Sequence, residues 1–415
     1  MIKKIITLFA IILSLSVESF AGGGSVYSRY GLGDYYYSFS ARRMGFGELG
    51  IATTDFDYLN YLNPASWSKL RLTRFETGLI YNGTKISSSN ESVFHSQTVV
   101  AGAMIGFPIA EDYGISFTAG ITPYSKVNYE IAGEERSDLV DPYNSVYLGE
   151  GGITKAFAGM SYKLPLDISI GAAFEYYTGK IQYKTSIEFN DTSDFRDASF
   201  KTDYSYKGVG FTLGLISNNL SEIFGVENLN DVRLGLTFSN SVKLTTDSTN
   251  TSSTVIGDVV SSSGTFKTDL PYRLGIGLSL KWADNYLFLL DYLRQPLSEL
   301  KRHGVKSEQM RDFQKFSFGV EYRNAESRSQ SFWAHIMLRG GISYEQSQYV
   351  INGKGLNQLS FYSGFSVPLG FDNTLDLAFQ YGKRGTTDNN LLTENIYKFS
   401  ITLSIGEFWF IRTDR

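Results

Sequence analysis

The stretch YRLGIGLSLKW at residues 272–282 places large apolar side chains at every second position, with small or charged residues between them. Side chains that alternate in this way point to opposite faces of a β-strand, so one face is apolar and the other polar. The stretches KFSFGVEY at 315–322 and YKFSITLSI at 397–405 repeat the pattern. This period of two predicts β-strands.

The same alternation recurs along the chain in fourteen segments, and bacterial single-chain membrane barrels have an even number of strands. Many segments exceed the roughly ten residues that strands of soluble sandwiches or propellers reach. An apolar face on every strand would aggregate in water, whereas lipid covers it. We therefore predict an all-β fold, a 14-stranded antiparallel transmembrane β-barrel, with strands near residues 70–82, 93–107, 113–132, 146–164, 166–189, 197–217, 231–246, 265–282, 284–294, 312–324, 331–347, 356–368, 374–382 and 394–406.

The connections between these segments differ in length. Short turns at one end of a barrel and long loops at the other are typical of membrane barrels. We expect long polar loops at 247–264 and 295–311, and one helical turn within 219–225. The expected short turns are at 110–112, 165, 283 and 370–373.

Composition argues against several classes of protein. The chain has 415 residues, with 38 Lys and Arg against 42 Asp and Glu, a net charge of −4. A broad basic face for nucleic acid is therefore not expected. Cysteine is absent, which excludes disulfides and thiolate metal sites. His95, His303 and His335 are scattered without the spacing of a metal site or a nucleophile–base pair, so we predict no metal, no cofactor and no enzyme.

The first 21 residues have the three parts of a secretory signal peptide. Lys3 and Lys4 precede an apolar run that is too short to span a membrane, and Ser19 and Ala21 suit the cleavage site. We predict export to the outer membrane of a Gram-negative bacterium. The predicted division is a signal peptide at 1–21, an N-terminal hatch inside the barrel at 22–69, the barrel at 70–406 and a C-terminal tail at 407–415.

Alternation also predicts which side chains face the lumen. Charged side chains there are expected to pair with one another: Arg74, Glu76, Glu175, Arg233, Arg273, Asp291, Lys315, Glu321, Arg339 and Asp376. Apolar side chains predicted to face inward would contact either a hydrophobic ligand or a hatch: Val100, Met104, Leu287, Leu289 and Met337. Arg273 or Arg339 could hold a ligand carboxylate.

Residues 22–69 lack alternation, which predicts a small folded hatch within the barrel. Gly45, Gly47 and Gly50 spell GxGxxG, but the strand and helix that a dinucleotide site needs are not predicted around them. We interpret these glycines as tight turns in a narrow lumen. Asn63, Pro64 and Ala65 predict the start of a short helix over 64–69, because Asn favours the N-cap and Pro the first helical position.

The run RMGFGELGIATTD at 43–55, followed by Asn63-Pro64-Ala65 and the first strand, resembles the N-terminal signature of FadL-type outer-membrane transporters. The resemblance implies a 14-stranded barrel with a hatch that carries fatty acids or other hydrophobic compounds by diffusion. It also implies a monomer among outer-membrane lipids, with ligand release through a gap at a kinked third strand. Pro123 and Tyr124 lie in the predicted third strand and are the candidates for this lateral gate. The residues after Glu407 depart from the family's usual C-terminal end on an aromatic residue.

An alternative remains open at this point. Some FadL-like barrels serve protein-secretion machines, and the long polar loops of this chain could dock such a partner. An outer-membrane enzyme is less favoured, because no spacing singles out a catalytic site.

Overall fold

A computed structural model describes residues 24–408, apart from 138–139, 190–194, 255–256, 325–331, 371–372 and 389–390. The predicted signal peptide at 1–21 and nearly all of the tail at 407–415 lie outside the described residues. In the described part of the chain, no helix is long and apolar enough to cross a membrane.

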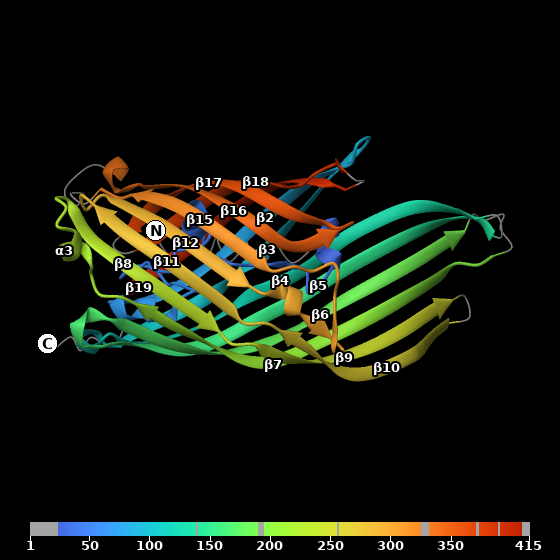
Figure 1. Ribbon diagram of the computed structural model, residues 1–415, viewed down its shortest axis with the longest axis horizontal. Helices are drawn as coiled ribbons and strands as arrows, with labels where there is room; N and C mark the ends of the chain where they lie inside the picture. Colours follow the sequence, from blue (N-terminus) through green and yellow to red (C-terminus); the bar gives the residue numbers. More distant parts are fainter. Residues whose placement is uncertain are drawn as a thin grey trace.

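The described chain forms a closed antiparallel β-barrel of fourteen strands, as predicted (Figure 1). Closure joins the last strand to the first long one along their whole length, from Thr393 opposite Ser87 to Glu407 opposite Thr73. The wall strands are β2 (Thr73–Ser87), β3 (Ser92–Ala110), β4 (Ile115–Ser137), β5 (Val140–Lys163), β6 (Ser169–Phe189), β7 (Ala198–Ile216), β8 (Leu229–Ser239) with β9 (Val242–Thr254), β10 (Gly257–Leu270) with β11 (Arg273–Trp282), β12 (Tyr286–Gln295), β15 (Phe313–Tyr322), β16 (Met337–Ile351), β17 (Lys354–Gly370), β18 (Asn373–Gly385) and β19 (Thr393–Glu407).

Two wall strands are longer than the sequence predicts, because β9 prolongs β8 and β10 runs on into β11. The loop expected at 247–264 is therefore wrong: most of it is β-strand. Both faces of β10 are exposed over 257–265, so no apolar and polar alternation marks it, while its Val and Thr residues favour extended backbone. The region 295–311 holds a short helix, η5 (Leu297–Glu299), and a small hairpin of β13 (Lys301–Arg302) and β14 (Val305–Lys306).

The predicted helical turn within 219–225 is confirmed as α3 (Ser221–Phe224). Single helical turns also close two of the predicted short connections, η3 (Glu111–Tyr113) and η4 (Pro165–Asp167). Another short helix, η7 (Phe332–His335), precedes β16. The turn expected at 370–373 lies partly outside the described residues.

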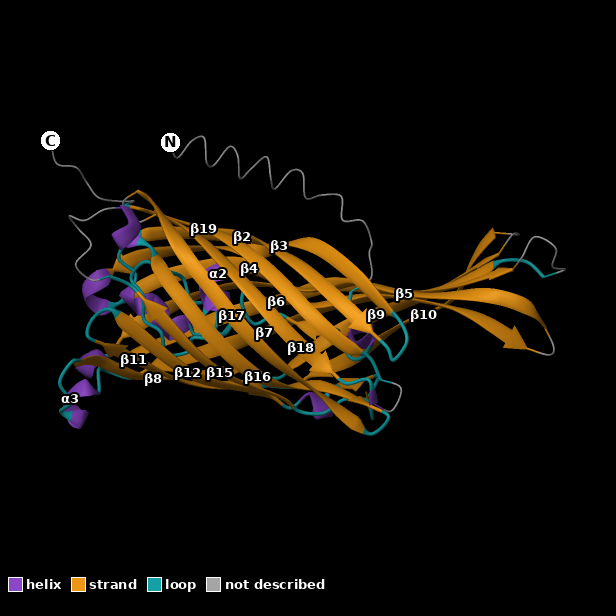
Figure 2. Ribbon diagram, turned by 90° about the horizontal axis from the view of Figure 1, so that it is seen from above, coloured by secondary structure: helices purple, strands orange, loops and turns teal. Residues whose placement is uncertain are grey.

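Six neighbouring strands, β4 to β7 with β9 and β10, extend well beyond the other strands at one end of the barrel (Figures 1 and 2). We call this part the projection; it comprises residues 128–150, 178–207 and 245–267. Most connections at the opposite end of the barrel are short turns, and the two longer ones contain α3 and η7. Because short turns of such barrels lie on the periplasmic side, the projection is placed on the extracellular side.

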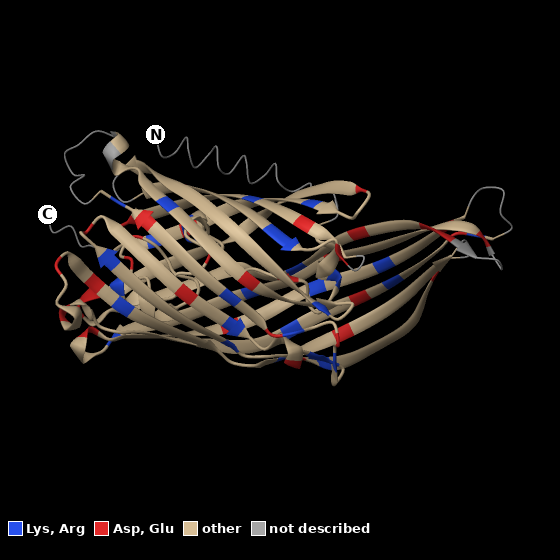
Figure 3. Ribbon diagram, turned by 45° about the horizontal axis from the view of Figure 1, so that its top comes forward, with Lys and Arg blue, Asp and Glu red and all other residues tan. Residues whose placement is uncertain are grey.

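The ten charged residues predicted to face the lumen are all buried, which confirms the phase of their strands. Figure 3 shows charged positions distributed along the wall strands. Large apolar side chains cover the opposite face of the wall; Phe174 is 60% exposed and Leu213 47%. Such a surface suits lipid.

The predicted lumen position of Val100 is wrong, because Val100 faces outward and is 47% exposed. A β-bulge shifts the register between β2 and β3: Gly78 lies opposite Gly102, but Leu79 lies opposite Val100. The extra residue, Ala101, reverses the faces beyond it. Met104, on the C-terminal side of the bulge, is buried as predicted.

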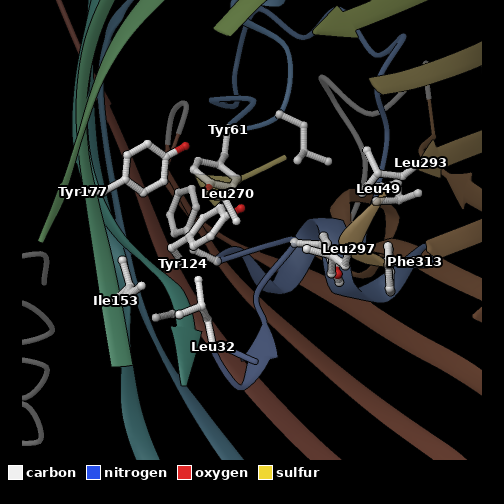
Figure 4. Close-up of a cluster of buried hydrophobic side chains, with 14 of the residues drawn as sticks. Leu32, Leu49, Tyr61, Tyr124, Ile153, Tyr177, Leu270, Leu293, Leu297 and Phe313 are labelled. Atoms are coloured by element: carbon white, nitrogen blue, oxygen red, sulfur yellow. The ribbon is translucent and has the colours of Figure 1, made fainter. Parts of the chain in front are cut away.

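Residues 24–72, which we call the N-terminal segment, run inside the barrel, where Figure 1 draws them in blue. They form η1 (Val26–Arg29), the two-residue β1 (Asp34–Tyr35), α2 (Ala41–Gly45) and η2 (Pro64–Lys69). Buried side chains of this segment, such as Leu32, Leu49 and Tyr61, pack against wall residues such as Tyr124 and Phe313 (Figure 4). The apolar core of the protein therefore lies inside the barrel.

Inward-facing glycines of the wall let the backbone of the N-terminal segment lie directly against it. A Cβ atom on Gly319 of β15 would overlap the carbonyl oxygen of Phe46, and one on Gly214 of β7 would overlap the Asn63 side chain. Similar overlaps with the segment would arise around much of the circumference, at Gly171, Gly235, Gly277 and Gly341. We call these six residues the glycine belt.

The glycine belt predicts a position-specific cost of one methyl group. Gly319→Ala should destabilise the barrel by about 1–3 kcal/mol, because the methyl group meets backbone that cannot move aside. Gly340→Ala is the matched control on the neighbouring strand, since its nearest neighbour is a Val320 methyl carbon 3.9 Å away. Unfolding of the two purified variants in detergent tests this, and equal stability would argue against tight seating of the segment.

Candidate functional site

The barrel wall is interrupted between β3 and β4. Pairing of these strands runs from Ala110 opposite Ile115 to Ala103 opposite Ile121 and then ends, although both strands continue. On its other side, β4 stays paired with β5 as far as Ser137. We call the unpaired stretch, 92–101 of β3 and 122–137 of β4, the β3–β4 gap.

Pro123 lies two residues beyond the last β3–β4 pair, where it cannot donate a backbone hydrogen bond. The register with β5 shifts between Pro123 and Ser125, so Tyr124 is the extra residue of a bulge. Tyr124 turns inward and makes edge-on ring contacts with Tyr35 and Tyr177, with centroids 5.4 and 5.0 Å apart. Pro123 and Tyr124, which the sequence analysis predicts as the lateral gate, therefore lie at the end of the gap where β3–β4 pairing stops.

The N-terminal segment supplies the backbone partners that β3 does not. Strand β1 pairs antiparallel with β4, with Asp34 opposite Lys126 and Tyr35 opposite Ser125. The Tyr36 amide donates to the Tyr124 carbonyl oxygen (3.0 Å), and the Gly24 amide donates to the carbonyl oxygen of Asn128 (3.0 Å). The edge of β4 is thus covered from inside the barrel over 124–128.

Side chains bridge the gap itself. Gln97 of β3 accepts hydrogen bonds through its Oε1 atom from Lys126 Nζ (2.6 Å) and from Asn128 Nδ2 (2.9 Å). Behind this bridge lies a cavity of about 100 Å³ that reaches His95, Asp34, Glu48, Arg384 and Lys398. The inner side of the gap is therefore narrow and polar.

A larger recess opens at the extracellular end of the gap. Its volume is about 460 Å³. Apolar residues form much of its lining, with Arg29, His95, Glu91 and Glu130 also present; the apolar residues include Val26, Tyr27, Ile131, Ile351, Leu391 and Leu392. This mixture suits a molecule with an apolar body and a polar end.

Charges fix the N-terminal segment to the wall. Arg42 of α2 contacts Asp55 (2.5 Å) and Glu321 of β15 (2.9 Å), and Arg339 of β16 also contacts Glu321 (2.6 Å). Arg384 of β18 contacts Asp34 (2.8 Å). The sequence predicts that charged lumen residues pair with one another across the barrel. Some of them instead pair with charged residues of the N-terminal segment. Sequence analysis missed Arg42, Asp34 and Asp55, although charges in a segment expected inside a lumen require partners.

Wall carboxylates also hold the backbone of the segment. Asp291 of β12 accepts hydrogen bonds from the amides of Gly50 and Ile51, both 2.9 Å long. Glu76 of β2 accepts one from the Leu59 amide (2.7 Å). These carboxylates face the lumen as predicted, and they satisfy backbone groups that have no secondary-structure partner.

The residues of the predicted hatch motif adopt the conformations expected of them. Gly47 and Gly50 have φ of +100° and +99°, a region that glycine enters without steric cost. Gly45 ends α2. Asn63 caps η2, its side chain accepting from the Ala65 amide, and Pro64 is the first residue of this helix, so the predicted short helix over 64–69 is confirmed.

The predicted lumen contacts do not form one pocket. Arg339 is fully engaged with Glu321, Asp376 (3.3 Å) and Ser366 (2.6 Å). Arg273 lies among the rings of Tyr61, Tyr124 and Tyr177, close to Glu175. Leu289 is buried on β12, while Leu287 and Met337 are only half-buried. Their role as ligand contacts stays a prediction.

Glu48, which belongs to the N-terminal segment and not to a membrane-spanning strand, is paired with Lys315 and with Lys398 (3.5 Å). Burial on its own raises the pKa of this carboxyl, but the two ammonium groups outweigh burial and lower the pKa to about 2. The unfolded chain has a glutamate pKa of about 4.3. These ion pairs therefore stabilise the fold above about pH 4, and their contribution is lost as the pH falls toward 2.

A family model described as BamG matches residues 1–414. The chain belongs to the BamG family. A search of curated proteins found no match. Among solved structures, the chain is similar to the Ralstonia pickettii toluene transporter TbuX (17% identity, TM-score 0.59, 90% of this chain and 99% of that one) and to the CymD monoaromatic hydrocarbon channel (15%, 0.58, 90% and 99%). It is also similar to the P. putida toluene transporter TodX (17%, 0.58, 91% and 100%).

A Pseudomonas aeruginosa FadL homologue aligns as well, with 11% identity and a TM-score of 0.56 over 87% of this BamG-family chain and 99% of that one. The resemblance to FadL-type barrels stated from the sequence is thus confirmed at the level of the fold. A barrel of this type fits a Gram-negative outer-membrane protein.

Removing the Arg42 guanidinium should loosen the segment. Arg42→Met leaves the buried carboxylates of Asp55 and Glu321 with fewer cationic partners, which should cost about 3–5 kcal/mol of unfolding free energy. Lys354→Met is the control, because its pair with Asp388 is exposed and should contribute nothing measurable. Denaturant unfolding in detergent measures both, and a small effect of Arg42→Met would mean that the segment is not held by this contact.

Acid should act through Glu48. The wild-type barrel should lose thermal stability between pH 4 and pH 2, the interval of about two units between the unfolded and the folded pKa of Glu48. Glu48→Gln should be less stable at pH 7 and should show a smaller loss over the same acid range. Glu222→Gln, at an exposed position in α3, serves as control. Identical acid profiles for Glu48→Gln and wild type would contradict the assignment.

Proposed function

We propose that this BamG-family barrel is a passive outer-membrane channel for long-chain fatty acids or other hydrophobic compounds, which leave sideways through the β3–β4 gap near Pro123. The observation that carries this proposal is the end of β3–β4 pairing at Ile121. A wall strand without its neighbour is the local condition for a lateral exit, because within a membrane wall backbone hydrogen bonds otherwise join each strand to the next.

The extracellular recess of about 460 Å³ is the proposed entry site. Its apolar lining would contact the body of the ligand, and Arg29 would meet a carboxylate where the ligand has one. TbuX and TodX are toluene transporters and CymD is a monoaromatic hydrocarbon channel, which supports a small hydrophobic cargo.

The N-terminal segment would act as the hatch. The cavity behind Gln97 holds only about 100 Å³, less than a fatty acid needs, so β1 and the Gln97 bridge must move for a ligand to pass. We propose that η1 and β1 shift together away from β4, because their contacts with β4 are a few backbone hydrogen bonds, the Ser28 hydroxyl and the ring contact of Tyr35 with Tyr124. The parts held by Arg42 and Asp291 would remain fixed.

Closing the gap chemically tests the proposal. The chain has no cysteine, so Gln97→Cys with Lys126→Cys can be joined by a cleavable bis-thiol reagent across the gap. Saturable uptake of a labelled fatty acid or toluene by cells that lack their own hydrophobic-compound channel should fall on cross-linking and recover on cleavage. Without the reagent, uptake should equal or exceed that of wild type, because the side-chain bridge is gone.

The matched control is Leu359→Cys with Lys383→Cys, which joins β17 to β18 where the two residues are already paired. Cross-linking there should leave uptake unchanged. Uptake that is insensitive to closure of the gap would remove the lateral route while leaving transport itself intact.

A docking barrel is the second candidate. It is favoured by the filling of the lumen with buried ion pairs and by the glycine belt, both of which suit a permanently seated segment. Flat uptake of every compound by correctly folded wild-type barrel would favour this function over transport.

A further inference from the structure

The projection is an open six-stranded sheet, so it has two edges that a closed barrel lacks. One edge is β4 beyond Ile121, and the other is the outer side of β10. In the part of the chain that the structure describes, the outer side of β10 pairs with β13 at Thr268 and Asp269, and the carbonyl oxygen of Lys267 accepts a hydrogen bond from the His303 amide (3.1 Å). Residues 257–266 present a row of backbone groups to the solvent.

The β4 edge is protected. The N-terminal segment pairs with it over 124–128, and the exposed stretch beyond carries Glu130, Glu134 and Glu135. Covering an edge and charging it are two ways in which proteins prevent the addition of a foreign strand.

The β10 edge lacks these devices over most of its length. Every residue from 257 to 265 is exposed, and Val259 and Val260 are each 64% exposed, on opposite faces of the strand. Asp258 and Lys267 are the only charges, one near each end, and the stretch contains no proline. A single bulge near Ser261 is the one irregularity. An exposed strand edge of this kind can form backbone hydrogen bonds with a strand of another chain.

The face beside this edge has the composition of a protein-binding surface. Asn250 and Ser252 of β9 share the inner face of the projection with Phe200 of β7, which lies opposite Ser252 and is 49% exposed. Aromatic rings among hydroxyl and amide groups are typical of surfaces that bind polypeptides. The charged residues Lys201, Asp203 and Lys207 belong to the opposite face.

A second copy of the chain does not fit this edge. Two barrels in one membrane have the same orientation, so a two-fold axis relating them runs along the membrane normal. Their β10 strands would then both point away from the membrane and, being tilted, would cross rather than align. Neither an antiparallel nor a parallel ladder can form between them.

We propose that the outer edge of β10, from Gly257 to Phe266, is a strand-addition site for an extended, uncharged segment of a different cell-surface protein. Strand β13 already occupies the lower end of this edge, so the added strand would continue an existing ladder. This proposal does not depend on transport. It rests on the docking function, and it names the surface that would bind the partner and the kind of segment that the partner would supply.

A peptide that copies the uncharged part of β9, Ser248–Thr254, is a suitable probe, because β10 already pairs with this sequence through its inner edge. Single-cysteine variants of the full-length barrel at 258–265 would each carry one thiol, and the peptide would carry one at its centre. Disulfide formation should peak at one register along β10. It should be lost when alternate peptide nitrogens are methylated, since methylation removes the backbone donors.

The same scan along 130–135 of β4 is the control, where Glu130, Glu134 and Glu135 should prevent capture. Equal capture at β4, capture unaffected by methylation, or no capture at β10 would each overturn the proposal.

Proline variants on β10 give a second test. Adjacent residues of a strand direct their amides to opposite edges, so one of Ser262→Pro and Ser263→Pro removes an outward donor and the other disturbs the ladder with β9. The first should abolish peptide capture while hydrogen exchange of the β9–β10 hairpin stays slow. Capture that survives both variants would contradict strand addition. Uptake measured in parallel should be unchanged, which separates failure of this site from failure of the channel.

Discussion

Every backbone N–H and C=O group in a membrane wall needs a hydrogen-bond partner within the protein. The rest of this structure depends on that requirement. Pairing of β19 with β2 meets that need where the barrel closes. Between β3 and β4 it is not met by the wall, and the N-terminal segment supplies the missing groups through β1, Gly24 and Ser28. The segment therefore does two things: it completes the backbone hydrogen bonding of the wall, and its side chains fill the lumen.

The same segment explains the charged lumen. Glu321, Asp291, Lys315 and Arg384 each bind a group of the segment. Buried ion pairs add little net stability compared with apolar packing, but losing one partner is costly, so they specify a position. The glycine belt adds a steric condition, since only this course of the backbone fits against the wall. Near the gap the segment meets β4 mainly through backbone atoms, while Asp34 and Ser25 of the same part are held by Arg384 of β18 and Glu394 of β19.

Much of the wall could be predicted from the sequence, because a face toward lipid and a face toward a polar interior impose a period of two. The phase of residues such as Arg74, Lys315 and Asp376 follows directly. Where that contrast vanishes, the prediction fails: the exposed strands of 247–264 are surrounded by water on both faces. The predicted inward position of Val100 is wrong for another reason: the amino-acid pattern does not show where a bulge adds one extra residue to a strand.

The site was predictable only in part. Pro123 marks the gap, since its ring removes a donor, and Asn63 and Pro64 mark η2. Gln97, Lys126 and Asn128 could not be found, because their meeting depends on where two strands separate in space. The salt links of the segment join residues hundreds of positions apart, and a single sequence carries no record of such pairs.

These long-range links bear on how the chain folds. Ser25 binds Glu394, the Ala41 amide binds Thr402, and Asp34 binds Arg384, so the contacts of the first part of the N-terminal segment are completed only by the last two strands. Contacts of such high sequence separation form late, since the loop that joins them must close first. The segment cannot reach its final position until β18 and β19 have formed. Its packing in the lumen therefore follows closure of the barrel.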